Sequence, residues 1–191
     1  MKYSIENISD LIDQSSKIID DSKKLSKIVL QVIEAITSSI EKGNKIILFG
    51  NGGSAADAQH MAAEFIGRFL NERRSFPAIS LTADSSIITS LGNDYGFEKI
   101  FQRQCESLVN NGDIIIAIST SGKSENVING IKTAKKKGGI IVGLTGIDGG
   151  EIKDLADYLI NIPSNHTPRI QEGHRTIIHI ICEAVEKILM K

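Results

Sequence analysis

Long apolar runs are missing from this sequence. No stretch approaches the roughly 20 apolar residues that a helix needs to cross a bilayer, and residues 1–7 lack the apolar core of a secretory signal peptide. An excess of one charge is missing as well, since 22 Lys and Arg side chains stand against 23 Asp and Glu. This balance does not favour a nucleic acid or an anionic membrane as partner. We therefore expect a cytoplasmic protein with neither nucleic acid nor membrane among its partners.

Cysteines and internal linkers are scarce. Cys105 and Cys182 are the only cysteines, and each lies in a helical apolar pattern. This placement predicts two reduced core thiols rather than a disulfide. The chain has no low-complexity tract, repeat or linker, and 191 residues are enough for one domain but few for two. We predict a single domain over 1–191, with residues 44–191 as its core.

The first 43 residues are expected to form a helical pair. Apolar residues recur at helical spacing over 5–19 and again over 25–40, and the second helix is expected to end near Gly43. No strand precedes them, so the pair could pack on its own domain or on another subunit. Of these two possibilities, contact in an oligomer is favoured.

From residue 45 onward, strand and helix patterns alternate. Runs of β-branched residues such as 114–116 and 140–142 lack the in-and-out alternation of a half-exposed strand, which favours a parallel sheet covered on both faces. The fold class is therefore α/β, a doubly wound domain with a parallel sheet. The expected strands are 45–49, 78–81, 113–118, 139–144 and 158–162, and the expected helices are 54–70, 83–91, 97–110, 124–137 and 168–190.

Three loops carry candidate binding residues, because ligands of such sheets bind outside the carboxyl ends of the strands. The first, 50–54, is rich in glycine and ends on Ser54, a natural N-cap. The second, 91–96, offers Asn93 and Asp94 between glycines. The third, 119–126, is the most informative.

This third loop has the composition of an anion cradle. It places hydroxyls and a glycine between a buried strand and a helix N-terminus, where free amides and the helix dipole favour a phosphate. The simpler interpretation, a helix cap among turn residues, is weaker because four hydroxyls fall within six residues. Ala117 stands where a Walker loop has its first glycine, so a nucleoside triphosphatase is disfavoured and no nucleotide cofactor is expected. The four hydroxyl residues are Ser119, Thr120, Ser121 and Ser124.

Two helices carry polar stripes with a spacing of four residues, which puts each stripe on one helix face. A carboxylate and an imidazole that meet above an anchored sugar phosphate can move a proton between adjacent carbons, as aldose–ketose isomerisation requires. Glu64 and His179 are the candidates for that pair, whereas His166 and His174 are weaker candidates for any role. The stripes are His60, Glu64 and Arg68 on one helix and Gln171, Arg175 and His179 on the other.

The motifs 51–55, His60 with Glu64, 119–124, and Gln171 with His179 resemble the sugar isomerase (SIS) domain superfamily. Within it they are similar to the phosphoheptose isomerase family, over nearly the whole chain. The resemblance implies a flavodoxin-like core of five parallel strands and a homotetramer with active sites between subunits. It also implies conversion of D-sedoheptulose 7-phosphate to D-glycero-D-manno-heptose 7-phosphate through an enediol, at the start of heptose synthesis for lipopolysaccharide or capsule.

The resemblance also assigns roles to residues. Glu64 would take the proton from the carbon beside the carbonyl, and His179 would be its partner across the enediol. A zinc ion is implied at His60, Glu64, Gln171 and His179. The implied substrate contacts are Asn51, Gly52, Gly53, Ser54, Glu64, Asn93, Asp94, Ser119, Thr120, Ser121, Ser124 and Gln171.

Two alternatives stay open at this point. One is a non-catalytic binding module of the same fold, such as a protein that associates with a replication initiator. The other is an isomerase or etherase that acts on a hexose or amino-sugar phosphate. A binding module has no use for an acid and a base, so the presence of both Glu64 and His179 favours the enzyme.

Overall fold

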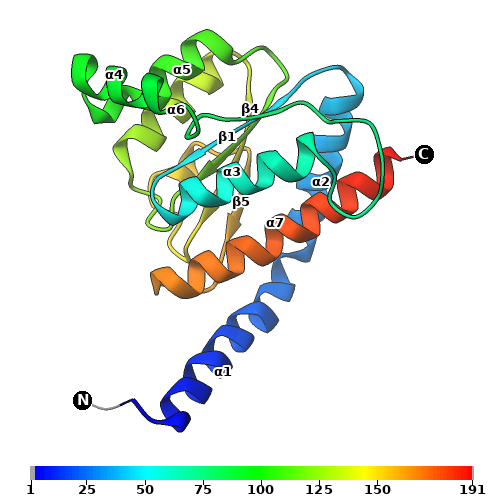
Figure 1. Cartoon of the computed structure of the whole chain (residues 1–191), viewed down its shortest axis with the longest axis vertical. Coiled ribbons are helices and arrows are strands. Elements are labelled where there is room, and N and C mark those ends of the chain that lie inside the picture. Colours follow the sequence, from blue (N-terminus) through cyan, green and yellow to red (C-terminus); the bar gives the residue numbers. More distant parts are fainter. Residues whose placement is uncertain (1–2, 191) are drawn as a thin grey trace.

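The computed structural model describes residues 3–190, and the elements follow the predicted order (Figure 1). The strands are β1 Ile46–Gly50, β2 Ala78–Ser80, β3 Ile114–Ile118, β4 Ile140–Thr145 and β5 Tyr158–Asn161. The α-helices are α1 Ile5–Asp21, α2 Ser26–Glu41, α3 Gly53–Ile66, α4 Ser85–Tyr95, α5 Ile100–Leu108, α6 Glu125–Lys136 and α7 Thr167–Leu189. Short 3-10 turns are η1 Ser22–Leu25, η2 Phe97–Lys99 and η3 Ile152–Asp154.

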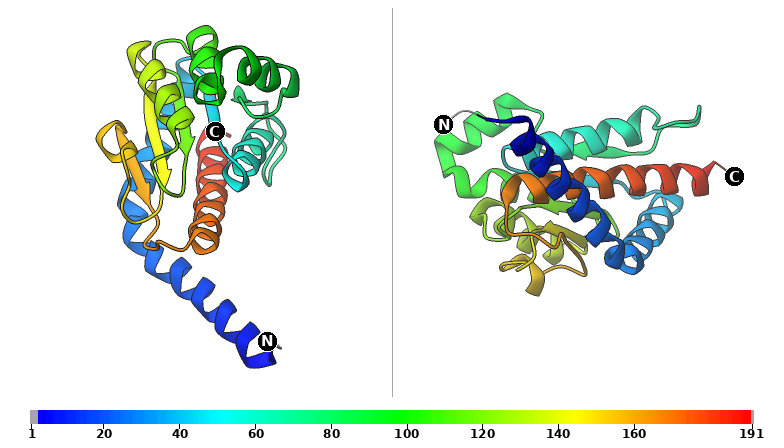
Figure 2. Two further views of the ribbon diagram at one scale, coloured as in Figure 1. Left: turned by 90° about the vertical axis from the view of Figure 1, so that its left-hand side faces the viewer. Right: turned by 90° about the horizontal axis from the view of Figure 1, so that it is seen from below.

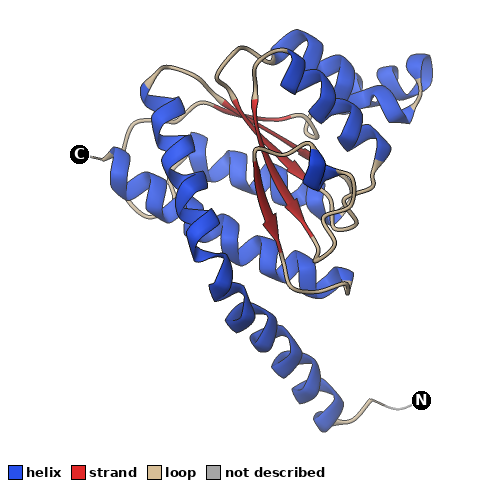
Figure 3. Cartoon of the chain, turned by 180° about the vertical axis from the view of Figure 1, so that it is seen from behind, coloured by secondary structure: helices blue, strands red, loops and turns tan. Residues whose placement is uncertain are grey.

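The five strands form one parallel sheet in the order β2-β1-β3-β4-β5 (Figure 3). Ile46 at the start of β1 pairs with Ala78 of β2 on one side and with Ile114 of β3 on the other. Because every strand runs the same way, the loops that leave their carboxyl ends gather at one edge of the sheet. The predicted doubly wound α/β fold is confirmed.

Helices cover both faces of this sheet (Figure 2). Ile46 and Leu48 of β1 point into one apolar cluster with α2, α3 and α7, whereas Ile47 and Phe49 point into a second cluster with α5 and α6. All residues of β1 and β3 are buried, which is why these strands read as continuous apolar runs. Cys182 belongs to the first cluster and Cys105 to the second, and both thiols are free and buried, as predicted.

The two leading helices have different surroundings. α2 packs on the sheet of its own domain, where Val32 and Ile36 are fully buried. α1 has no buried residue and extends away from the domain (Figure 1), with Ile5, Ile8 and Ile12 exposed. A role of the pair in oligomer contact stays a prediction, and it now depends mainly on α1.

Two local predictions are wrong. Ser54 is not the N-cap of α3, because a turn at Gly52 with φ +56° starts the helix at Gly53 and buries Ser54 in the first turn. The expected loop 91–96 is the end of α4, so Asn93 and Asp94 are helical and the chain turns only at Gly96, where φ is +93°. In α4 a capped N-terminus outweighs the weak helix propensity of an interior glycine, since Asp84 accepts the N–H of Ile87 at 3.0 Å.

No helix within residues 3–190 combines the length and the apolar character that a membrane span requires.

Candidate active site

A cavity of about 270 Å³ opens where β1 and β3 pass into α3 and α6. It brings together eight of the residues expected to bind substrate, from three segments far apart in the chain. Thr167, the first residue of α7, also lines the cavity and was not among the residues predicted from sequence. The lining residues are Asn51, Gly52, Gly53, Ser54, Ile118, Ser119, Thr120, Ser124, Thr167 and Gln171.

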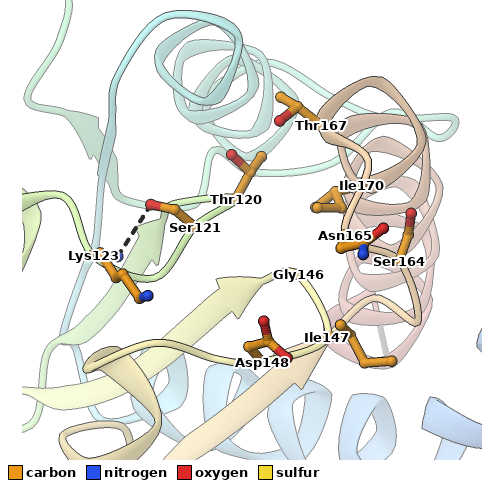
Figure 4. Close-up of a pocket in the computed structure, with 10 residues that line it drawn as sticks. All are labelled: Thr120, Ser121, Lys123, Gly146, Ile147, Asp148, Ser164, Asn165, Thr167 and Ile170. Carbon is orange, nitrogen blue, oxygen red and sulfur yellow. Dashed lines mark hydrogen bonds between the residues drawn. The ribbon is translucent and has the colours of Figure 1, made fainter.

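A second cavity, of about 200 Å³, adjoins the first and shares Thr120 and Thr167 with it (Figure 4). Ser121 lines this second cavity together with Lys123, and its Oγ accepts the backbone N–H of Lys123 at 3.2 Å. The four predicted hydroxyls are therefore divided between two adjoining cavities at the same edge of the sheet. The loops after β4 and β5 form the far wall, with Asp148 among their residues.

Hydroxyls and a helix N-terminus converge on the first cavity. Ser119 Oγ lies 3.0 Å from Ser124 Oγ and 3.5 Å from Ser121 Oγ. Ser124 occupies the N-cap position of α6, but its side chain makes no capping hydrogen bond. The positive end of the α6 dipole and these hydroxyls suit a bound anion such as a phosphate monoester.

The side chain of Asn51 has a structural partner. Its amide exchanges two hydrogen bonds with the amide of Asn126, both 2.9 Å long, which ties the loop after β1 to the start of α6. Asn126 lies 75 residues away in sequence and is nearly fully buried. This contact could not be predicted from sequence, because an Asn in a first helical turn carries no sign of so distant a partner.

The two polar stripes face each other. α3 and α7 lie side by side (Figure 1), and His60 Nε2 is 3.0 Å from His179 Nε2. Glu64 Oε1 is 3.4 Å from the same His60 nitrogen. A β-carbon on Gly53 would come 2.4 Å from Gln171 Nε2, so α3 starts close beside α7. His60 thus joins the two residues predicted to transfer protons, although none of these three residues lines either cavity.

A further ion pair lies on this face and was missed from sequence. Arg175 Nη2 contacts Asp57 Oδ1 at 2.5 Å, and Asp57 is almost fully buried. Burial raises the pKa of Asp57, and the Arg175 guanidinium opposes that rise. Burial and the same guanidinium lower the pKa of His60, which favours a neutral imidazole.

Other candidates lie elsewhere. The helix predicted over 54–70 ends at Ile66, so Arg68 lies outside α3 and is not part of the stripe; it is exposed and pairs with Glu72 at 3.5 Å. Asn93 and Asp94 are exposed on α4, hydrogen-bonded to each other at 2.8 Å, and line neither cavity of this chain. His174 is buried with Nε2 3.1 Å from the carbonyl oxygen of Thr145, and burial lowers the pKa of this imidazole to about 4. These contacts make His174 a core residue.

His166, the other weaker histidine candidate, occupies the N-cap position of α7, where its side chain is exposed and makes no capping hydrogen bond. It lines neither cavity.

The expected zinc ligands fit in part. In a tetrahedral site with Zn–N distances of about 2.0–2.1 Å, two ligand atoms lie about 3.3 Å apart. The His60–His179 and His60–Glu64 separations of 3.0 and 3.4 Å are close to this value. Within residues 3–190, however, no three His, Cys, Asp or Glu side chains form a group that could hold a metal ion. Each of the two pairs therefore has the spacing of zinc ligands, but the described residues do not bring three such side chains together around one point.

Comparisons with known proteins show which family this chain belongs to. The model of the SIS domain family matches residues 10–146. A phosphoheptose isomerase from Geobacter metallireducens is 54% identical over 156 residues, which cover 82% of each chain. Among solved structures, the phosphoheptose isomerase of Neisseria gonorrhoeae has a TM-score of 0.90 at 38% identity, covering 95% of this chain and 98% of the other. That of Francisella tularensis has a TM-score of 0.93 at 33% identity, covering 97% and 100%. The chain therefore belongs to the SIS domain family and, within it, to the phosphoheptose isomerases.

Proposed function

We propose that this chain is an aldose–ketose isomerase that converts D-sedoheptulose 7-phosphate to D-glycero-D-manno-heptose 7-phosphate, the first step of heptose synthesis for lipopolysaccharide or capsule. The observation that carries the proposal is the meeting of the two stripes: one imidazole, His60, lies within 3.4 Å of both His179 and Glu64. Relatives named phosphoheptose isomerase support it, because their sequences and folds match nearly the whole chain. A non-catalytic module would need the cavity but not this acid–base group.

Each part of the site has a defined task in this reaction. Ser119 and Ser124, with the N-terminus of α6, hold the phosphate, so the sugar chain extends along the face between α3 and α7. The Glu64 carboxylate takes the proton from the carbon beside the carbonyl and returns it to the neighbouring carbon. The His179 imidazole moves a proton between the two enediol oxygens. Positioning by the phosphate supplies much of the rate, because general acid–base catalysis contributes only about 10²- to 10⁴-fold.

A zinc ion belongs to the proposal. His60, Glu64, Gln171 and His179 would hold it, and when bound it would polarise the substrate oxygens as a Lewis acid. We expect about one zinc per subunit in protein purified without chelator, measured by elemental mass spectrometry, and much less in the double variant His60→Ala, His179→Ala. Zinc-free wild-type protein with full turnover would contradict this assignment.

The active unit is proposed to be a cytoplasmic homotetramer with sites between subunits. Two features support an assembly: α1 leaves its apolar side chains exposed, and the predicted substrate residues Asn93 and Asp94 line no cavity of their own chain. In an assembly these two residues could reach the cavity of a neighbour.

The decisive experiment is the substitution Glu64→Gln. We expect a folded protein that still binds inorganic phosphate, with turnover of sedoheptulose 7-phosphate and exchange of solvent deuterium into the sugar lowered at least about 100-fold. Glu72→Gln is the matched control, because the Glu72 side chain is 91% exposed and pairs with Arg68 on the surface. Near-wild-type turnover in Glu64→Gln would exclude the proposed role of Glu64. A wild-type protein that binds the sugar without turnover would favour the binding module, and faster turnover of a hexose phosphate would favour the other alternative.

A further inference from the structure

A buried ion pair joins Arg73 and Glu186, close to the predicted proton-transfer residues Glu64 and His179. Arg73 belongs to the segment between α3 and β2, and Glu186 lies on α7. Arg73 Nε donates to Glu186 Oε2 at 3.1 Å, and the two side chains are 4% and 1% exposed. Truncating one partner of such a pair leaves a buried charge without compensation, so the pair constrains both segments strongly.

The arginine of this pair holds the end of α3. Arg73 Nη2 donates to the carbonyl oxygen of Glu64 at 2.7 Å, and Nη1 donates to that of Phe65 at 3.0 Å. The last carbonyls of a helix have no partner within the helix, so the guanidinium replaces the missing donors. The guanidinium also stacks on the Phe76 ring at 4.0 Å, which fixes its plane. Arg73 therefore fixes the backbone from which the Glu64 side chain projects.

The glutamate of this pair holds the segment that packs on His179. Glu186 accepts the backbone N–H groups of Phe69, Leu70 and Asn71 at 2.8, 2.9 and 2.8 Å. The Phe69 ring in turn lies 5.7 Å from the His179 imidazole, tilted by 45°. Glu186 follows His179 by seven residues, close to two helical turns, so both lie on the same face of α7. Glu186 thus acts on the imidazole through the ring of Phe69.

We propose that the Arg73–Glu186 ion pair is a positioning device that sets Glu64 and His179 at the separation and orientation that proton transfer needs. The inference rests on the proposed isomerase function. Arg73 acts on the carboxylate through the α3 backbone, and Glu186 acts on the imidazole through Phe69. Neither residue touches the substrate. The competing interpretation is that the pair only stabilises the fold.

Three variants test the two arms of this device, the connection from Arg73 to Glu64 and the connection from Glu186 to His179. Arg73→Lys keeps a cation beside Glu186 but loses the planar fork that reaches Glu64, so it should fold. Phe69→Leu removes the ring from His179 and leaves the backbone N–H bonds to Glu186 in place. Glu186→Gln disrupts both arms.

Asp113→Asn is the matched control. Asp113 is also 1% exposed and paired, with its Oδ2 2.6 Å from Lys45 Nζ and 2.8 Å from the backbone N of Asn110. It precedes β3, at the edge of the sheet opposite the cavity. This variant should therefore lower stability without moving the site.

Two readouts decide between positioning and simple stability. We expect kcat to fall about 10- to 100-fold in Arg73→Lys and Glu186→Gln, with the inhibition constant of inorganic phosphate unchanged. Asp113→Asn should lower the melting temperature while kcat stays near wild type. The ring-proton NMR signal of His179 should shift in Phe69→Leu and Glu186→Gln and not in Asp113→Asn. If kcat is unchanged in Arg73→Lys and Glu186→Gln and this signal is unchanged in Glu186→Gln, or if Asp113→Asn alters both equally, the positioning role is excluded.

The NMR readout is independent of turnover. If the wild-type protein did not isomerise the sugar phosphate, the proposed function would fail, and the His179 signal would still decide whether the ion pair positions that imidazole.

Discussion

Glu186 shows how a single buried side chain can make stability depend on pH. It accepts five hydrogen bonds, three of them from consecutive backbone N–H groups. Burial alone would raise the pKa of this carboxyl, but the N–H groups of Leu70, Phe69 and Asn71 outweigh burial and lower the pKa to about 2, from an ordinary value of 4.5.

A group whose pKa is lowered in the folded state stabilises the protein above its unfolded pKa. We therefore expect this contribution to be complete above pH 4.5 and to be lost as the pH falls from about 4.5 toward 2. Urea unfolding of the wild-type protein at a series of pH values should show the loss. Glu186→Gln should be less stable at pH 7 and should lose less between pH 4.5 and 2. Equal pH dependence in the two proteins would assign the acid lability to other carboxyls.

At the scale of elements, the loops after β3 and β4 contact each other backbone to backbone. Gly122 has φ +65°, and a β-carbon there would lie 2.1 Å from the carbonyl oxygen of Gly149. The carbonyl of Gly122 also accepts the N–H of Glu151 at 2.9 Å. The shape of the hydroxyl-bearing loop therefore depends on its neighbour and not only on its own residues.

Gly122→Ala tests this contact, with Gly43→Ala as its control. Both glycines have positive φ, but a β-carbon on Gly43 would meet nothing within 4 Å. The control should cost about 1–2 kcal/mol of stability for the left-handed backbone and leave phosphate inhibition unchanged. Gly122→Ala should cost more and weaken phosphate binding at least tenfold, because the loop must move. Equal behaviour of the two variants, by thermal unfolding and inhibition kinetics, would mean that the loop contact does not matter.

The order of the elements could be predicted from the sequence, whereas several contacts of the site could not. Continuous runs such as 114–116 reveal buried parallel strands, and spacing by four reveals that His60 and Glu64 share a helix face. Local patterns do not encode distant partners, and Glu186 meets Phe69 across 117 residues. The same limit explains Asn126 and Asp57, which only the packing of the helices and loops brings to the site. The prediction of a loop over 91–96 was wrong. Glycine and asparagine usually disfavour a helix, but the N-cap at Asp84 stabilises α4, which continues through these residues.

At the scale of the whole molecule, α1 is an amphipathic helix that contacts α7 of its own chain but leaves apolar side chains of its N-terminal half exposed. Ile8 and Ile12 are 53% and 60% exposed, and they lie on one face of the helix. Stable monomers rarely expose an apolar stripe on a projecting helix, because contact with water is unfavourable for it. We therefore expect this stripe to be covered by another subunit.

The double variant Ile8→Asp, Ile12→Asp should dissociate the assembly. We expect wild-type protein to have the mass of a tetramer by light scattering and the variant to have a smaller mass, because a carboxylate in an apolar interface is costly. Lys17→Glu is the control, since Lys17 is exposed on the opposite side of α1. If the site lies between subunits, the dissociated variant should also lose turnover. A variant that remains tetrameric would place the interface elsewhere.

The separation of the two thiols on opposite sides of the sheet has a practical consequence. Burial raises the pKa of Cys105 and of Cys182 to about 12, so neither thiol reacts readily with an alkylating reagent while its surroundings stay closed. The rate at which each cysteine is alkylated therefore measures how often its own layer of helices opens. Equal labelling rates would indicate that the chain opens as one cooperative unit, and faster labelling of Cys182 would indicate that the layer with α3 and α7 opens first.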